Sequence, residues 1–193
     1  MSMVDNGKRV TAGAVATLLA DVYLTMSGNP LNADRYAEAA ALSQDIINGT
    51  YGSYELVQHD EVSPGVIDPE NSAYNKIRKG DASAVEHIYI KEYDPEIGTS
   101  VYPRYSYPVA LASDVLYDIT NGGYLPSDGF LDLYDPADDL RIQEKQYFHS
   151  TFQDTEQTFA TAPYVWHDDT AVFETANSGK DFVVYGYADV LLI

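Results

Sequence analysis

Tyrosine is the residue type that stands out for its chemistry, with 17 copies among 193 residues. Aromatic side chains are densest in residues 102–107 (YPRYSY) and in residues 164–168 (YVWHD), which contain the single tryptophan, Trp166. An aromatic face can stack on a sugar ring while its hydroxyl or N–H group bonds the sugar hydroxyls. Tyrosines also serve as half-buried core residues, so both interpretations stay open. The side chains we predict to contact a ligand are Trp166, Tyr164, Tyr102, Tyr105 and Tyr107.

Histidine and aspartate could form a catalytic pair at His167-Asp168-Asp169, where a carboxylate would orient the imidazole as in a hydrolase. No GxSxG nucleophile motif accompanies this pair, and solvated polar residues are the favoured interpretation. A pair of acids for glycoside hydrolysis stays open, because the separation of two carboxylates is a property of the fold. The four histidines have no metal-ligand spacing; they are His59, His87, His149 and His167.

Five aspartates lie close together between residues 128 and 139. Carboxylate oxygens suit Ca²⁺, but the spacing lacks the alternate-position acids and the glycine of an EF-hand loop. We therefore predict no metal site and no cofactor. The five residues are Asp128, Asp132, Asp135, Asp138 and Asp139.

Charge and composition limit the classes of partner. The chain has 11 Lys and Arg against 30 Asp and Glu, a formal net charge of −19, so phosphate backbones and anionic membrane surfaces would be repelled. We expect no nucleic-acid partner. With 45% hydrophobic and 21% charged residues the composition is globular, and without cysteine no disulfide or thiolate site can form. Residues 1–5 do not resemble a signal peptide, so we expect a mature, truncated or cytosolic chain.

Two helices are predicted at the front of the chain. Apolar residues between 7 and 32 recur at three- and four-residue intervals, which is typical of one face of a helix. Gly28-Asn29-Pro30 should end this helix near Ser27. A second pattern over 33–48 ends at Gly49 and predicts an antiparallel helix hairpin. The apolar stripe of the first helix comprises Val10, Ala14, Val15, Leu18, Leu19, Val22, Tyr23 and Met26.

The remaining elements are expected to be short. Residues 51–80 are rich in Pro and Gly and predict mostly loop, with one short helix over 72–78. Residues 85–93 predict a strand. Helical spacing over 110–120 predicts a helix that ends at Gly122-Gly123. Residues 182–185 should be extended and lead into a final helix.

Several segments resemble one family in the same order. Residues 7–26 (GKRVTAGAVATLLADVYLTM) and 36–56 (YAEAAALSQDIINGTYGSYEL) are similar to the helical core of the SusD/RagB family, which comprises cell-surface glycan-binding lipoproteins. VEHIYIKEY at 85–93, GFLDLYDPADDLR at 129–141 and GKDFVVYGYADVLLI at 179–193 follow the same pattern.

The resemblance implies a mainly α fold: a tetratricopeptide-like helical-repeat core of SusD-like type, with long irregular loops and few short strands. It implies a single SusD-like domain over 1–193, truncated at both ends, because family members are more than twice as long. Within it, 7–50 would be the helix hairpin, 51–178 a loop-rich ligand-binding region, and 179–193 the start of the next helical repeat.

The function implied is non-catalytic binding of an oligosaccharide or polysaccharide at the outer-membrane surface, for nutrient uptake. The bound glycan would pass to a SusC-like TonB-dependent transporter. A lipid anchor, absent from this chain, would hold the full-length protein. Two alternatives remain: a structural or protein-interaction module of a transporter complex without direct glycan binding, and, more remotely, a glycoside hydrolase.

Two positions depart from the family pattern. Asp139-Leu140-Arg141 resembles the family's Asp-Pro-Arg motif, in which an acid and an arginine organise a turn, but leucine replaces the proline. Gly186 stands where members usually have arginine before the Tyr-Ala-Asp/Glu run. A glycine there removes a fixed charge and should loosen the start of the last helix.

Overall fold

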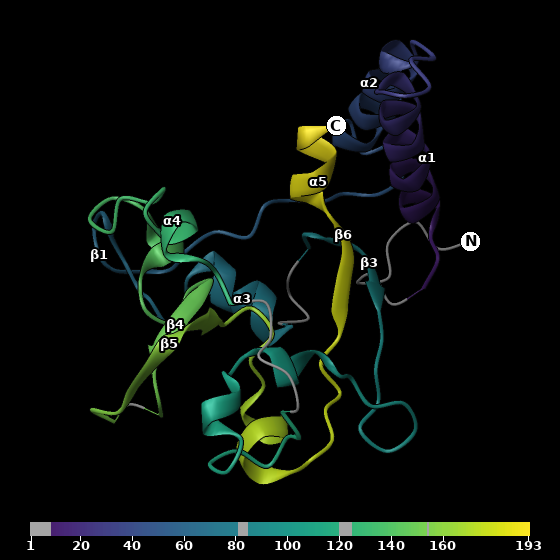
Figure 1. The fold of residues 1–193 in the computed structure, drawn as a ribbon. Coiled ribbons are helices and arrows are strands. Elements are labelled where there is room, and N and C mark those ends of the chain that lie inside the picture. Colours follow the sequence, from purple (N-terminus) through teal and green to yellow (C-terminus); the bar gives the residue numbers. More distant parts are fainter. Residues whose placement is uncertain (1–8, 81–84, 120–124, 154) are drawn as a thin grey trace. The chain divides into compact units, whose positions relative to one another are not determined.

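A computed structural model describes residues 9–80, 85–119, 125–153 and 155–193 of the chain (Figure 1). The chain divides into two compact units, each built from stretches that are separate in sequence. The helical unit comprises Met1–Val57, Ala82–Glu92 and Asp181–Ile193. The loop-rich unit comprises Gln58–Asp81 and Tyr93–Lys180.

Helices α1 (Ala12–Ser27) and α2 (Tyr36–Ile47) form the predicted hairpin of the helical unit (Figure 1). Thr11 begins α1 as a cap, because its hydroxyl oxygen accepts a hydrogen bond from the Ala14 N–H at 3.1 Å. The helix ends at Ser27, as predicted from Gly28-Asn29-Pro30.

The face of α1 that is buried differs from the prediction. The buried positions of α1 carry small residues: Gly13, Ala14, Ala16, Thr17, Ala20 and Ser27. By contrast, Val15, Leu18, Leu19 and Val22 are between 39% and 51% exposed. Small side chains allow close approach by a neighbour, and a Cβ at Gly13 would lie only 2.0 Å from the Tyr54 hydroxyl.

A strand pair and a last helix complete the helical unit. Strands β3 (His87–Lys91) and β6 (Phe182–Gly186) pair antiparallel, and α5 (Tyr187–Leu192) follows directly. The predicted strand, extended segment and final helix are thus confirmed. Glycine at position 186 is expected to loosen the start of the last helix. The Gly186 N–H, however, donates a hydrogen bond to the Asp189 carboxylate at 2.7 Å, which compensates in part. The unit's core contains Ala14, Ala16, Ile46, Tyr54, Ile88 and Val190.

The loop-rich unit consists of short elements around an aromatic core. Its helices and turns are α3 (Ala73–Lys79), η1 (Tyr102–Tyr105), η2 (Val109–Leu111), α4 (Asp128–Leu131), η3 (Leu140–Ile142) and η4 (Thr170–Glu174). Its strands pair antiparallel: β1 (Glu61–Ser63) with β2 (Val66–Ile67), and β4 (Phe148–Thr151) with β5 (Thr158–Pro163). The core contains Tyr107, Leu111, Val115, Tyr117, Ile119, Phe152, Ala171 and Val172.

The helix predicted over 110–120 is wrong for the described residues beyond Leu111, where the short 3₁₀ helix η2 ends. Residues 112–117 form turns and bends, and the N–H of Leu116 donates to the carbonyl of Val172 at 2.6 Å. Val115 and Tyr117 are buried without a helix, while Leu116 is 55% exposed. A neighbouring segment accepts one of the main-chain hydrogen bonds that a helix would otherwise satisfy. The predicted end at Gly122-Gly123 lies outside the described residues.

The predicted fold class is also wrong. Apart from α1 and α2 the described helices are short, three two-stranded sheets accompany them, and no further helix pair extends α1 and α2 into a repeat. The described residues therefore mix helix and strand and show no tetratricopeptide-like repeat core. Beyond α2 the chain is rich in Gly, Pro and aromatic residues, which favour turns and short ladders over long helices.

Candidate functional site

Three of the five predicted ligand-binding residues lie together in the loop-rich unit. Tyr102 and Tyr105 occupy the two ends of the 3₁₀ helix η1, where residues three apart share one face. Both rings contact Trp166: the Tyr102 ring is stacked at a centroid distance of 6.3 Å, and the Tyr105 ring is edge-on at 5.8 Å. We call these three residues the aromatic platform. All three side chains are partly exposed to solvent.

Main-chain hydrogen bonds hold Trp166 in place. The N–H of Tyr164 donates to the carbonyl of Tyr147 at 2.7 Å, and the N–H of His167 donates to the carbonyl of Tyr164 at 2.9 Å. The resulting turn directly follows β5. The residues after this turn form η4, which contacts η1. The segment that carries Trp166 is therefore packed against the segment that carries Tyr102 and Tyr105.

The other two predicted residues, Tyr107 and Tyr164, are buried. Tyr107 is 2% exposed and lies at the centre of the aromatic core, in ring contact with His149 at 4.9 Å and His167 at 5.7 Å. Tyr164 stacks on His167 at 4.7 Å with the ring planes 16° apart. Their predicted contact with a ligand stays a prediction, although both line the pocket described next.

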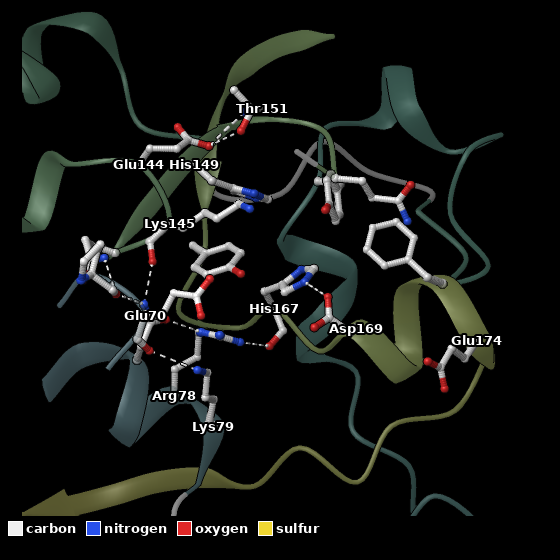
Figure 2. Close-up of a pocket in the computed structure, with 17 residues that line it drawn as sticks. Glu70, Arg78, Lys79, Glu144, Lys145, His149, Thr151, His167, Asp169 and Glu174 are labelled. Carbon is white, nitrogen blue, oxygen red and sulfur yellow. Dashed lines mark hydrogen bonds and ion pairs between the residues drawn. The ribbon is translucent and has the colours of Figure 1, made fainter. Parts of the chain in front are cut away.

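A pocket of about 850 Å³ opens in the loop-rich unit (Figure 2). This volume falls within the range of small-molecule sites, which is about 300–1,000 Å³. Its lining combines charged, polar and aromatic side chains from α3, β4, η4 and the turn after β5. The lining residues central to its chemistry are Arg78, Glu144, His149, Tyr164, His167 and Asp169. We call it the histidine pocket.

Arg78 brings a partly buried positive charge to the histidine pocket. Its Nε donates to the Asn75 side-chain oxygen at 2.9 Å, and its Nη1 donates to the carbonyl of His167 at 3.1 Å. The guanidinium carbon lies 4.4 Å from the centre of the Tyr164 ring, a cation–π contact. Burial lowers the pKa of Arg78. The guanidinium remains charged at any physiological pH, because its ordinary pKa is far above neutral.

Two buried histidines, His149 and His167, line this pocket with their ring centres 5.9 Å apart and their ring planes tilted by 57°. The Nε2 of His149 lies 2.5 Å from the carbonyl oxygen of Ser106, and the Nε2 of His167 lies 2.6 Å from Oδ1 of Asp169. Burial lowers the pKa of His149 to about 4 and also lowers that of His167. Both imidazoles are therefore neutral at pH 7.

The acids that line the pocket have protein partners. The Glu144 carboxylate accepts hydrogen bonds from the N–H and hydroxyl groups of Ser150 and Thr151, at 2.6 to 3.1 Å. Although burial opposes it, this set of hydrogen bonds lowers the pKa of Glu144. The hydrogen bond from His167 lowers the pKa of Asp169. Both carboxylates are thus ionised at pH 7.

Sequence reasoning missed most of the histidine pocket. Solvated polar residues were the favoured interpretation of His167-Asp168-Asp169, which is wrong for His167 because it is 3% exposed. His149, 2% exposed, carried no predicted role beyond the lack of metal-ligand spacing. The His167–Asp169 contact does form, as the alternative interpretation required. Nothing in the sequence pattern distinguishes Arg78. A single arginine near the end of a predicted helix gives no indication of which distant residues its side chain contacts in the fold.

The acidic segment shows a turn. Two guanidinium nitrogens of Arg141 contact the Asp139 carboxylate at 2.6 to 3.2 Å, and the Arg141 N–H donates to it at 3.0 Å. The predicted acid–arginine turn is confirmed, with Leu140 in place of proline. Among the described residues, no group of three His, Cys, Asp or Glu side chains could hold a metal ion.

Comparison with known proteins gives one match of fold. The sequence matches no family model and no curated protein. A solved structure of a SusD superfamily protein from Parabacteroides distasonis ATCC 8503 matches with a TM-score of 0.77 at 27% identity. The match covers 100% of this chain and 40% of that chain, so this chain spans less than half the length of the solved one. The SusD/RagB resemblance of the sequence motifs is thereby confirmed, and the chain has a SusD-like fold along its whole length.

Proposed function

We propose that this chain binds a glycan without cleaving it, as part of a SusD-like system for nutrient uptake at the cell surface. The observation that carries the proposal is the aromatic platform of Tyr102, Tyr105 and Trp166. In this proposal the loop-rich region 51–178 is the ligand-binding region, and the platform is its first contact with the sugar.

The platform suits a sugar for physical reasons. Pyranose rings expose C–H faces that pack on aromatic rings, while Tyr hydroxyls and the indole N–H can bond the hydroxyls at the ring edge. Trp166, Tyr102 and Tyr105 are each partly exposed, so part of this aromatic surface is open to a ligand. Affinity should be modest, because a sugar buries little apolar area and must be ordered on binding.

The geometry around His167 supports a non-catalytic role. In a Ser-His-Asp triad, the imidazole nitrogen opposite the carboxylate bonds the nucleophile. Asp169 occupies the Nε2 side of His167, and Nδ1 has no hydrogen-bond partner among the residues that the structure describes. Among the described residues, no hydroxyl therefore occupies the nucleophile position of a Ser-His-Asp triad beside His167.

Transfer to a TonB-dependent transporter and attachment to the outer membrane through a lipid are further parts of the proposal, and they rest on the SusD-like fold. No helix within the described ranges is long and apolar enough to cross a membrane. Co-purification of the full-length protein with a SusC-like transporter from outer membranes would support this part. A full-length protein that fractionates away from membranes would contradict it.

A second candidate function is a protein-interaction module. It is favoured by α1, where four large apolar side chains are 39% to 51% exposed; they are Val15, Leu18, Leu19 and Val22. Exposed apolar stripes of this kind often mark protein contacts. Under this alternative, a transporter would bind the protein while sugars would not.

Titration calorimetry with a panel of neutral and acidic polysaccharides would test glycan binding. For any glycan bound, Trp166→Ala should weaken affinity about tenfold or more, because a central stacked aromatic contributes about 2 kcal/mol. Tyr36→Ala is the matched control, because Tyr36 is an exposed aromatic of α2 in the helical unit. Equal affinities of both variants and the wild type would refute the platform, and binding to no glycan would refute the function.

A further inference from the structure

We infer that the histidine pocket is a second saccharide subsite, which holds sugar hydroxyls by hydrogen bonds where the aromatic platform holds a sugar by stacking. The inference rests on the proposed glycan-binding function. It assigns to Arg78, His149 and His167 a role in ligand binding. Figure 2 shows their side chains around one opening, arriving from α3, β4 and the turn after β5.

Arg78 supplies hydrogen-bond donors that the described residues do not use. A guanidinium has five N–H groups, and the contacts of Arg78 with the described residues engage one on Nε and one on Nη1. None of these contacts is with a carboxylate. Asp168 and Asp169 attract the Arg78 charge without a hydrogen bond to it, and burying a cation that lacks such a bond is costly. An acceptor from a ligand in the pocket would lower that cost.

The two histidines supply acceptors. A carbonyl oxygen can only accept, so the Nε2 of His149 must carry the proton toward Ser106, which leaves Nδ1 with a lone pair. The ionised Asp169 fixes the same tautomer in His167. No described residue donates to either Nδ1 atom, and that of His167 is buried. A buried polar atom without a partner calls for an unseen one.

A hydroxyl group matches this combination. It both donates and accepts, so adjacent sugar hydroxyls can donate to an imidazole Nδ1 and accept from the guanidinium. A purely anionic ligand such as phosphate would satisfy Arg78 but would meet the histidine lone pairs and the ionised Glu144 and Asp169. The lining thus favours a ligand with many hydroxyls over an anion.

Stacking is not the mode of binding in this pocket. His167 lies parallel to the Tyr164 ring at 4.7 Å, and the guanidinium of Arg78 lies 4.4 Å from the same ring centre. The His149 ring also contacts Tyr164, at 4.8 Å, so protein groups already pack against the Tyr164 ring. Tyr164 is thus a positioning residue, which orients the Arg78 donors and the His167 acceptor.

Nitrogen NMR of the intact chain labelled with ¹⁵N-histidine would test the subsite. The probes are cellohexaose, maltohexaose, mannohexaose and inorganic phosphate, each added to saturation at pH 7.5. A bound hexasaccharide should shift the Nδ1 resonances of His149 and His167 toward the values of a hydrogen-bonded acceptor and leave His59 unchanged. Phosphate should shift neither.

The outcomes separate this inference from the proposed function. Binding that is lost in Trp166→Ala, with both Nδ1 resonances unmoved in the wild type, would overturn the subsite and leave the platform standing. A pocket filled only by water would give this result. Phosphate shifts without sugar shifts would likewise overturn the inference. Resonances and calorimetry that respond to none of the sugars would overturn both.

A variant pair gives a second measurement. Arg78→Met keeps an unbranched side chain beside Tyr164 but removes the donors, and should weaken hexasaccharide affinity about tenfold, since a hydrogen bond from a charged group contributes about 1.5–3 kcal/mol. Lys76→Met on the same helix is the control, because Lys76 bonds Asp60 and Gln58 outside the pocket. Both variants are compared at matched circular dichroism and Tm. Equal affinity in a folded Arg78→Met protein overturns the role of Arg78.

Discussion

Helix α1 and the loop-rich unit bury opposite kinds of residue. In α1 the buried positions hold glycine, alanine and other small residues, while leucines and valines are exposed. In the loop-rich unit, segments without long helices enclose large side chains such as Tyr107, Phe152 and Leu111. Helix α1 thus packs through small residues, whereas large side chains fill the core of the loop-rich unit.

The contrast follows from how the main-chain N–H and C=O groups of each segment are satisfied by hydrogen bonds. A helix satisfies its own main chain, so two helices are free to approach closely wherever small residues allow it. An irregular segment must find its partners elsewhere. In the loop-rich unit they come from other segments, as when the Leu116 N–H donates to Val172 and the Tyr164 N–H donates to Tyr147. These bonds bring the aromatic side chains together.

We expect the largest effect from a substitution of Tyr107, which tests whether the loop-rich unit has a specific core. Truncation by Tyr107→Ala should lower the free energy of unfolding by about 3–5 kcal/mol, because it leaves a cavity among packed rings. Urea unfolding followed by tyrosine and tryptophan fluorescence measures the change. Tyr36→Ala in α2, where the ring is 54% exposed, should cost much less. Similar losses for the two variants would mean that the loop-rich unit has no specific core.

Lowering the pH should destabilise the folded protein through its buried histidines, which gives a second test of the contrast between the two units. Because burial lowers the pKa of His149 to about 4, the unfolded chain, with a histidine pKa of 6.5, binds the extra proton first as the pH falls. The stabilisation is present in full above about pH 6.5 and is lost between pH 6.5 and 4. The loss amounts to about 3 kcal/mol from His149. Burial also lowers the pKa values of His167 and of His87 in the helical unit, with the same sign.

Urea unfolding from pH 7.5 to 4 would check this expectation, with hydrogen exchange to locate the loss. Strands β4 and β5 should lose protection at higher pH than α1. The variant His149→Gln should show a flatter dependence on pH than the wild type. A free energy of unfolding that stays constant from pH 7 to 4.5 in the wild type would show that these histidines are accessible to protons in the folded protein.

The smallest expected effects come from paired substitutions in α1. Gly13→Ala should destabilise by about 1 kcal/mol although alanine is the better helix former, because its Cβ would overlap the Tyr54 hydroxyl. Leu18→Ala removes a much larger group from an exposed position and should change stability by less than about 0.5 kcal/mol. Thermal unfolding measures both. Tyr54→Phe in the Gly13→Ala background should restore part of the lost stability. If Leu18→Ala were more destabilising than Gly13→Ala, the leucines and not the small residues would form the packed face of α1.

Part of the candidate site could be predicted from the sequence. The aromatic segments 102–107 and 164–168 were visible as local clusters, and three of their rings do meet in the fold. The tyrosine spacing in YPRY even matches one face of a 3₁₀ turn. The histidine pocket gave no such signal, because Arg78, His149 and His167 are far apart in sequence and each is unremarkable alone.

By itself the sequence determined the local elements and the family resemblance. The helices of the hairpin, strand β3 and the last helix depend on residues that are neighbours along the chain, so their periodicity and their Gly-Asn-Pro stop can be read directly. Tertiary structure alone decided which face of α1 is buried, that residues 112–117 form turns, and that two histidines share a pocket with an arginine. These outcomes depend on contacts between distant segments, where packing volume and main-chain hydrogen bonds outweigh local preference.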